Sequence, residues 1–148
     1  MTLDVFIDQY TDPRWCDLGV RPKVAKAFQS LCERLPDRIF DRCPRICFFI
    51  PAPGLFGSTV LMPSGPNAED ALIYLAPSLE RQSQTQVDFT VAHEFAHALL
   101  RHHLPANDRL SKKELRGSYL NWKSEAAADK LALKWGFTLP AYRKKRDD

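Results

Sequence analysis

The pattern of apolar and polar positions first predicts a helix at residues 22–35. Its apolar residues recur at helical spacing and form one stripe, at Val24, Phe28, Leu31 and Leu35. Pro22 suits the first turn of a helix, and Pro36 ends the segment. We expect this stripe to pack in the core and to have no other role.

Three short runs of β-branched and aromatic residues then predict strands, at residues 45–50, 58–62 and 71–76. Pro51 closes the first run and Pro77 closes the third. The connections between the runs are short and rich in Pro and Gly. These features predict a small, mostly antiparallel sheet.

Two further helices are predicted downstream, at residues 87–103 and 124–135. In the first, Val91, Phe95, Ala98 and Leu99 share an apolar face that can pack on the sheet. Ser124 is a candidate N-cap for the second, and Gly136 is a natural residue to follow its end, with Phe137 supplying the usual apolar contact. Helices and strands together predict an α+β fold.

Length and composition limit the class of protein. A chain of 148 residues, 45% hydrophobic and 26% charged, fits one soluble domain, which we place at residues 1–142. No apolar run approaches the ~20 residues of a membrane span, and the N-terminus does not resemble a signal peptide, so a cytoplasmic location is expected. The net charge of +3 does not favour nucleic acid as a direct partner. The charged tail, 143–148, is predicted to be solvated, the alternative being contact with nucleic acid or an acidic surface.

Four cysteines are present: Cys16, Cys32, Cys43 and Cys47. Cys43 and Cys47 are four positions apart, which is wider than the usual paired spacing of zinc-binding cysteines, and no second pair follows. Reduced cysteines packed in or near the core are therefore the favoured interpretation. A second zinc site and a redox pair are the alternatives.

Residues 93–97 read His-Glu-Phe-Ala-His, an HExxH pattern. Positions i and i+4 of a helix lie about 40° apart and one turn along, so His93 and His97 can both direct a ring nitrogen at one metal ion. Glu94 lies roughly 100° round the helix, where it can act as a general base on water without being a ligand. HExxH is short enough to occur by chance. However, the helix is otherwise apolar, and buried polar side chains without partners would be costly there.

A catalytic zinc site needs a third protein ligand. Glu125 and Asp129 lie at i and i+4 on the last helix, among alanines that would let the two helices approach closely. Glu125 is therefore the candidate third ligand, and Asp129 the candidate acceptor for the second ring N–H of a ligand histidine. The alternative is that both are surface residues, Glu125 favoured by the helix dipole and Asp129 paired with a cation or water.

The segments Phe89–His97 and Ser124–Ala132 resemble the ImmA/IrrE family of gluzincin peptidases, whose helices typically read FTLAHELGH and EAEADRFA. This resemblance implies a zincin-like fold with the sheet packed against the HExxH helix and the following ExxxD helix. It also implies Zn²⁺ held by His93, His97 and Glu125, with Glu94 as general base. It further implies an intracellular peptidase that often cleaves a transcriptional repressor.

This chain departs from the family pattern in two ways. Ala96 stands where the family often has Gly, and no helix-turn-helix region is evident, so a regulatory partner would be a separate protein. Candidate donors for a reaction oxyanion are Tyr119, His102 and His103.

The leading hypothesis is a zinc-dependent peptidase acting on a protein or peptide. The alternatives are a zinc-binding regulatory module without turnover and a toxin- or effector-type peptidase.

Overall fold

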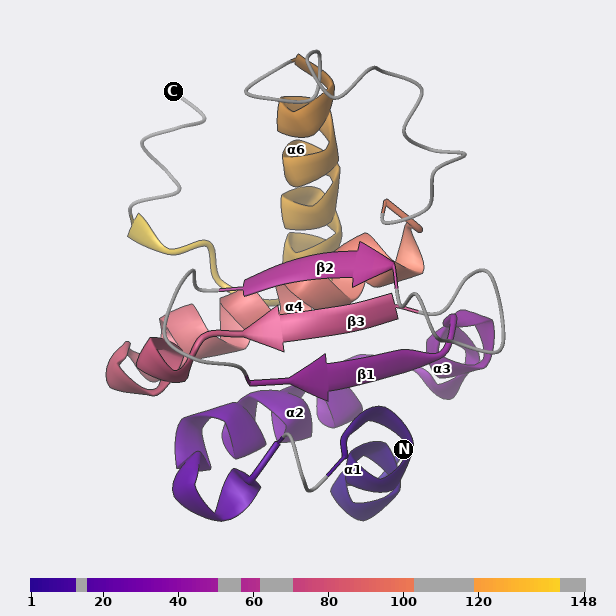
Figure 1. Cartoon of the computed structure of the whole chain (residues 1–148). Coiled ribbons are helices and arrows are strands. Elements are labelled where there is room, and N and C mark those ends of the chain that lie inside the picture. The colour runs from indigo at the N-terminus through magenta and orange to yellow at the C-terminus, as the bar shows by residue number, and fades with distance from the viewer. Residues whose placement is uncertain (13–15, 51–56, 62–70, 103–118, 142–148) are drawn as a thin grey trace.

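The computed structural model describes residues 1–12, 16–50, 57–61, 71–102 and 119–141 (Figure 1). A three-stranded sheet lies on one side of the helix α4, and the helices α1 and α2 lie near the β1 edge. The elements in chain order are α1 (Leu3–Tyr10), η1 (Leu18–Val20), α2 (Pro22–Arg34), α3 (Asp37–Arg42), β1 (Ile46–Phe49), β2 (Gly57–Leu61), β3 (Ala71–Leu75), η2 (Pro77–Arg81), α4 (Gln84–Leu99) and α6 (Tyr119–Lys134).

The predicted α+β class is confirmed, as are the helix at residues 22–35 and all three strands, with ends shifted by one or two residues. The sequence pattern missed α1 and α3. Thr2 begins α1 because its side chain accepts a hydrogen bond from the Val5 backbone N–H. Phe6 and Tyr10, one helical turn apart, are the buried residues of α1.

The prediction of a mostly antiparallel sheet is wrong, because the sheet is mixed. Its strand order is β1-β3-β2. β3 pairs antiparallel with β2, but it pairs parallel with β1, with Ile46 opposite Ala71. The prediction rests on the short connections between consecutive strands, which favour antiparallel pairing of neighbours in the chain. Instead β3 inserts between the other two, and after two reversals of direction the chain runs alongside β1 in the same sense.

An aromatic cluster forms the centre of the core. Phe6 contacts the rings of Tyr10, Phe28, Phe40, Phe48 and Phe95, which come from α1, α2, α3, β1 and α4. Phe95 of α4 also meets Trp135, with ring centroids 6.2 Å apart. Residue 95 lies about 200° round the helix from both His93 and His97. Packing of Phe95 into this cluster therefore turns the two histidines toward the opposite side of α4.

The helix α6 packs against α4 through small side chains, since Ala128 and Ala132 are fully buried. It begins at Tyr119, so the prediction of Ser124 as its N-cap is wrong; Ser124 lies one turn inside the helix. Its predicted end is confirmed. Gly136 has φ +94°, and the backbone N–H groups of Gly136 and Phe137 donate to the carbonyls of Leu133 and Ala132.

The end of α6 is tied to α2 by Arg34. The guanidinium of Arg34 donates to the carbonyl of Gly136 and lies over the ring of Phe137, 4.9 Å from its centroid. This contact fixes α6, and the carboxylates it carries, relative to the rest of the core.

Among the described helices, none is long and apolar enough to cross a membrane. The predicted charged tail, 143–148, lies outside the described residues. The HExxH helix, predicted at residues 87–103, begins earlier, at Gln84, and the prediction of its end near His103 is wrong, because α4 ends at Leu99 and residues 100–102 form a turn.

Replacing Gly136 by alanine tests the α6 cap. A side chain at φ +94° is strained, and a Cβ there would lie 2.8 Å from Nη1 of Arg34. We expect Gly136→Ala to lower the free energy of unfolding by about 1–2 kcal/mol in a denaturant titration. Lys134→Ala, at an exposed position two residues earlier, is the control and should cost much less. Equal stability of both variants would contradict this account of the cap.

Candidate metal centre

The helix α4 carries Thr90 and three ionisable side chains inside the core. Ser83 caps its start by accepting a hydrogen bond from the Gln86 backbone N–H. From Phe89 to Ala98 every residue is buried, including His93, Glu94 and His97, which are 6%, 6% and 7% exposed. A helix buried on all sides offers these side chains little water, so their polar atoms need partners from the protein or from a bound ion.

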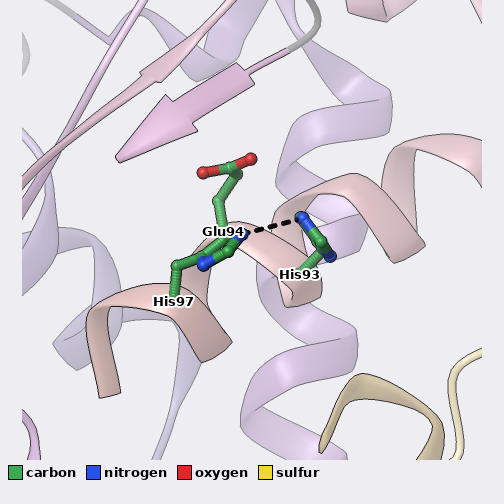
Figure 2. Close-up of side chains that lie close together, drawn as sticks. All are labelled: His93, Glu94 and His97. Atoms are coloured by element: carbon green, nitrogen blue, oxygen red, sulfur yellow. Dashed lines mark hydrogen bonds between the residues drawn. The ribbon is translucent and has the colours of Figure 1, made fainter. Parts of the chain in front are cut away.

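Glu125 of α6 meets both histidines. Its Oε2 lies 2.9 Å from Nε2 of His93, and its Oε1 lies 3.0 Å from Nε2 of His97. The two Nε2 atoms are themselves 3.0 Å apart (Figure 2). Two ring nitrogens and two carboxylate oxygens thus converge on one point between α4 and α6. The ExxxD spacing predicted this contact. It joins Glu125 to His97, 28 positions earlier in the chain, and to His93, 32 positions earlier.

The other ring nitrogen of each histidine also faces a partner. Oδ1 of Asp129 lies 2.7 Å from Nδ1 of His93, although the ring N–H is not well aligned with it. Nδ1 of His102 lies 2.8 Å from Nδ1 of His97. Each ring therefore has a partner at Nδ1 while its Nε2 points at Glu125. A partner at the second ring nitrogen is what orients metal-binding histidines in proteins.

The electrostatics of the cluster favour positive charge. Burial alone lowers the pKa of His93, but the carboxylates of Asp129 and Glu125 outweigh burial and raise it to about 9. Burial alone raises the pKa of Glu125, but hydrogen bonds with His93 and His97 hold it far below its usual range. A cation in the cluster would be attracted by the same carboxylates.

The converging atoms fit a metal ion. If Nδ1 of His93 carries its hydrogen toward Asp129, the Nε2 of the neutral ring presents a lone pair, as do both oxygens of ionised Glu125. Lone pairs about 3 Å apart repel one another unless a proton or a metal ion lies between them. A tetrahedral zinc ion, with bonds of about 2.0–2.1 Å, separates its ligand atoms by about 3.4 Å. The observed separations of 2.9–3.0 Å would therefore have to increase by only ~0.4–0.5 Å.

Glu94 lies beside this point and not within it. Among the described residues, ligand atoms of His93, Glu94 and His97 come within 4.8 Å of one another, a group that could hold a metal ion. Figure 2 shows the Glu94 carboxylate projecting from α4 toward the strands, away from the line that joins the two imidazoles. Glu125, and not Glu94, makes the close contacts with both Nε2 atoms.

The predicted oxyanion donors have different outcomes. His102 contacts Nδ1 of His97, on the far side of that ring from Glu125, so the structure does not direct it at the convergence point. His103 lies outside the described residues, and Tyr119 begins α6 without a described side chain. Sequence reasoning missed the contact between His102 and His97. The only signal for it was the place of His102 just beyond the end of the helix.

The four cysteines are free thiols, and none belongs to the metal-binding group of the described residues. Burial raises the pKa of Cys16 and of Cys43 to about 12, and it also raises the pKa of Cys32 and Cys47. Unreactive, core-associated thiols agree with these surroundings.

Alkylation with iodoacetamide tests the state of these thiols. A thiol of pKa about 12 is roughly 0.01% thiolate at pH 8, so we expect Cys16 and Cys43 to react at least ~100-fold more slowly in the folded protein than in denaturant. Mass spectrometry of timed samples measures each rate. Rapid labelling of either residue in the folded protein would show that it is not buried as described.

Comparison of the chain with protein-family models, with curated proteins and with solved structures finds no match.

Proposed function

We propose that this protein is a zinc-dependent metallopeptidase, with His93, His97 and Glu125 as the ligands. The observation that carries the proposal is the convergence of two buried imidazoles and the partly exposed carboxylate of Glu125 on one point, each nitrogen and oxygen about 3 Å from the next. Two imidazoles and one carboxylate are a ligand set of catalytic zinc, which leaves a coordination position for the reaction. A structural zinc site would instead be closed by a fourth protein ligand.

Glu94 supplies the proton transfer. A bound zinc ion would supply Lewis acidity, which makes water more acidic and polarises a carbonyl. The carboxylate of Glu94, close to the ligand atoms but not between them, can take a proton from attacking water and pass it to the leaving amine. Because Glu94 is buried, its carboxylate works where little bulk water competes for the proton.

The sheet offers a place for an extended peptide. By analogy with zincins, the strand predicted at residues 71–76 is a candidate edge for aligning substrate, but β3 lies at the centre of the sheet and is not an edge. Of the two edges, β2 is the one that packs against α4. A substrate strand added along β2 would use its backbone N–H and C=O groups and would run near the metal centre. Glu125 is partly exposed, at 37% of its side chain, so the centre is open on the α6 side.

The substrate class follows from the resemblance noted above. An intracellular protein, such as a separate transcriptional regulator, is the proposed substrate, because the HExxH and ExxxD segments resemble those of a peptidase family that often cleaves repressors.

Metal analysis of the purified full chain tests the ligands. We expect about one zinc per chain in the wild type, and loss of zinc in His97→Ala and Glu125→Ala, because each removes one of three ligands. Asp129→Ala should bind zinc 10–100-fold more weakly, because the variant lacks the carboxylate that faces Nδ1 of His93 and orients its ring. Lys130→Ala, an exposed neighbour on α6, is the matched control. A folded wild-type protein without affinity for zinc would refute the proposal.

Glu94→Gln separates binding from catalysis. The variant should retain zinc and lose about 10²–10⁴-fold in the rate of cleavage of a quenched fluorescent peptide library, because a general base contributes about that factor. Glu33→Gln, which changes an exposed carboxylate on α2, should cleave like the wild type. If zinc-loaded wild type and Glu94→Gln behave alike in cells and in vitro, the protein is a zinc-binding module without turnover.

A further inference from the structure

The helix α4 ends in a turn that returns the chain toward the metal centre. The backbone N–H of Arg101 donates to the carbonyl of Ala98 over 3.1 Å, and that of His102 donates to the carbonyl of His97 over 3.0 Å. These two hydrogen bonds make a Schellman motif, in which the residue after the cap adopts a left-handed conformation. In this turn the left-handed residue is Arg101, with φ +59°.

Arginine at this position is unusual, because glycine avoids the strain that a Cβ brings to positive φ. The side chain of Arg101 is itself part of the turn. Its guanidinium donates to the carbonyl of Leu99 over 2.9 Å and to the carbonyl of Arg42, at the end of α3, over 3.0 Å. These hydrogen bonds connect the strained turn to α4 and to α3. They hold the next residue, His102, in place.

The residue that follows is His102, and the turn sets its ring against His97. In a Schellman motif the side chain two positions beyond the cap commonly makes an apolar contact with the residue three positions before the end of the helix. Here those positions are His102 and His97. Their ring centroids are 5.0 Å apart, and the apolar contact is replaced by the 2.8 Å contact between the two Nδ1 atoms.

We propose that His102 is a positioning residue for His97. This inference rests on the proposed function and deepens it. In the zinc-loaded protein Nδ1–H of His97 donates to Nδ1 of His102, which directs the lone pair on Nε2 of His97 toward the point shared with His93 and Glu125. His93 and His97 are then held by different groups: a carboxylate, Asp129, stands behind His93, and a second imidazole stands behind His97.

Two variants of His102 separate positioning from packing. His102→Phe keeps a planar ring at the turn but removes the hydrogen-bond acceptor. His102→Asn loses the ring but places an amide oxygen near the position of Nδ1. Zinc affinity is measured in the full chain by competition with a chromogenic chelator. Proton exchange at Nδ1 of His97 is measured by nitrogen-15 NMR of the zinc-loaded protein, and the unfolding midpoint is measured after removal of the metal.

We expect His102→Phe to bind zinc 10–100-fold more weakly, with faster exchange of the His97 Nδ1 proton and an unchanged midpoint of the metal-free protein. The zinc affinity of His102→Asn should stay within about 3-fold of the wild type, because its amide oxygen keeps an acceptor for the His97 ring N–H. This change is smaller than the 10–100-fold loss expected when such an acceptor is removed. Wild-type zinc affinity in His102→Phe would overturn this inference and leave the proposed function intact. Equal weakening in both variants, with a lowered midpoint, would show a structural role only. A wild-type protein that binds no zinc would overturn both.

Discussion

The burial of α4 on all sides from Phe89 to Ala98 is the constraint from which the rest of the site follows. His93, Glu94 and His97 lie in this buried stretch, and each is less than a tenth exposed. Buried polar groups without partners are destabilising by several kcal/mol, roughly 2–7 for one amide or hydroxyl. Glu125, Asp129 and His102 supply partners for the ring nitrogens. What remains is a point where several lone pairs meet, which a cation would satisfy.

The position of α6 therefore matters as much as that of α4. Its two carboxylates reach the histidines because alanines on the same helix allow close approach, Ala128 and Ala132 being fully buried. At its far end the helix is anchored by the contact between Phe95 and Trp135 and by the bond from Arg34 to Gly136. Contacts remote from the candidate metal centre thus decide where the proposed ligands lie. Mutations in this anchor should alter metal binding through geometry and not through lost ligands.

The strand order of the sheet likewise decides where the proposed peptide substrate could bind. Because β3 takes the central place, its backbone groups are used in both ladders, and β2 is left as the edge that packs against α4. The order of strands thus places the available backbone beside the helix that carries the candidate base. A sheet paired in chain order would have put β2 in the centre and left β3 as an edge.

The sequence by itself determined what depends on local spacing. HExxH places His93 and His97 on one helical face, and ExxxD places Glu125 and Asp129 on another, because the period of a helix is the same in every context. The end of α6 was equally readable, since Gly136 is suited to a left-handed cap.

Only the tertiary structure decided which groups meet. The pairing of β3 with β1, the packing of Phe6 and Tyr10 from a helix without a long apolar stripe, and the contact of His102 with His97 each depend on residues brought together by folding. Arg101 shows the reason most clearly. Local preference disfavours arginine at positive φ, and its conformation is held by Arg42, 59 residues earlier in the chain.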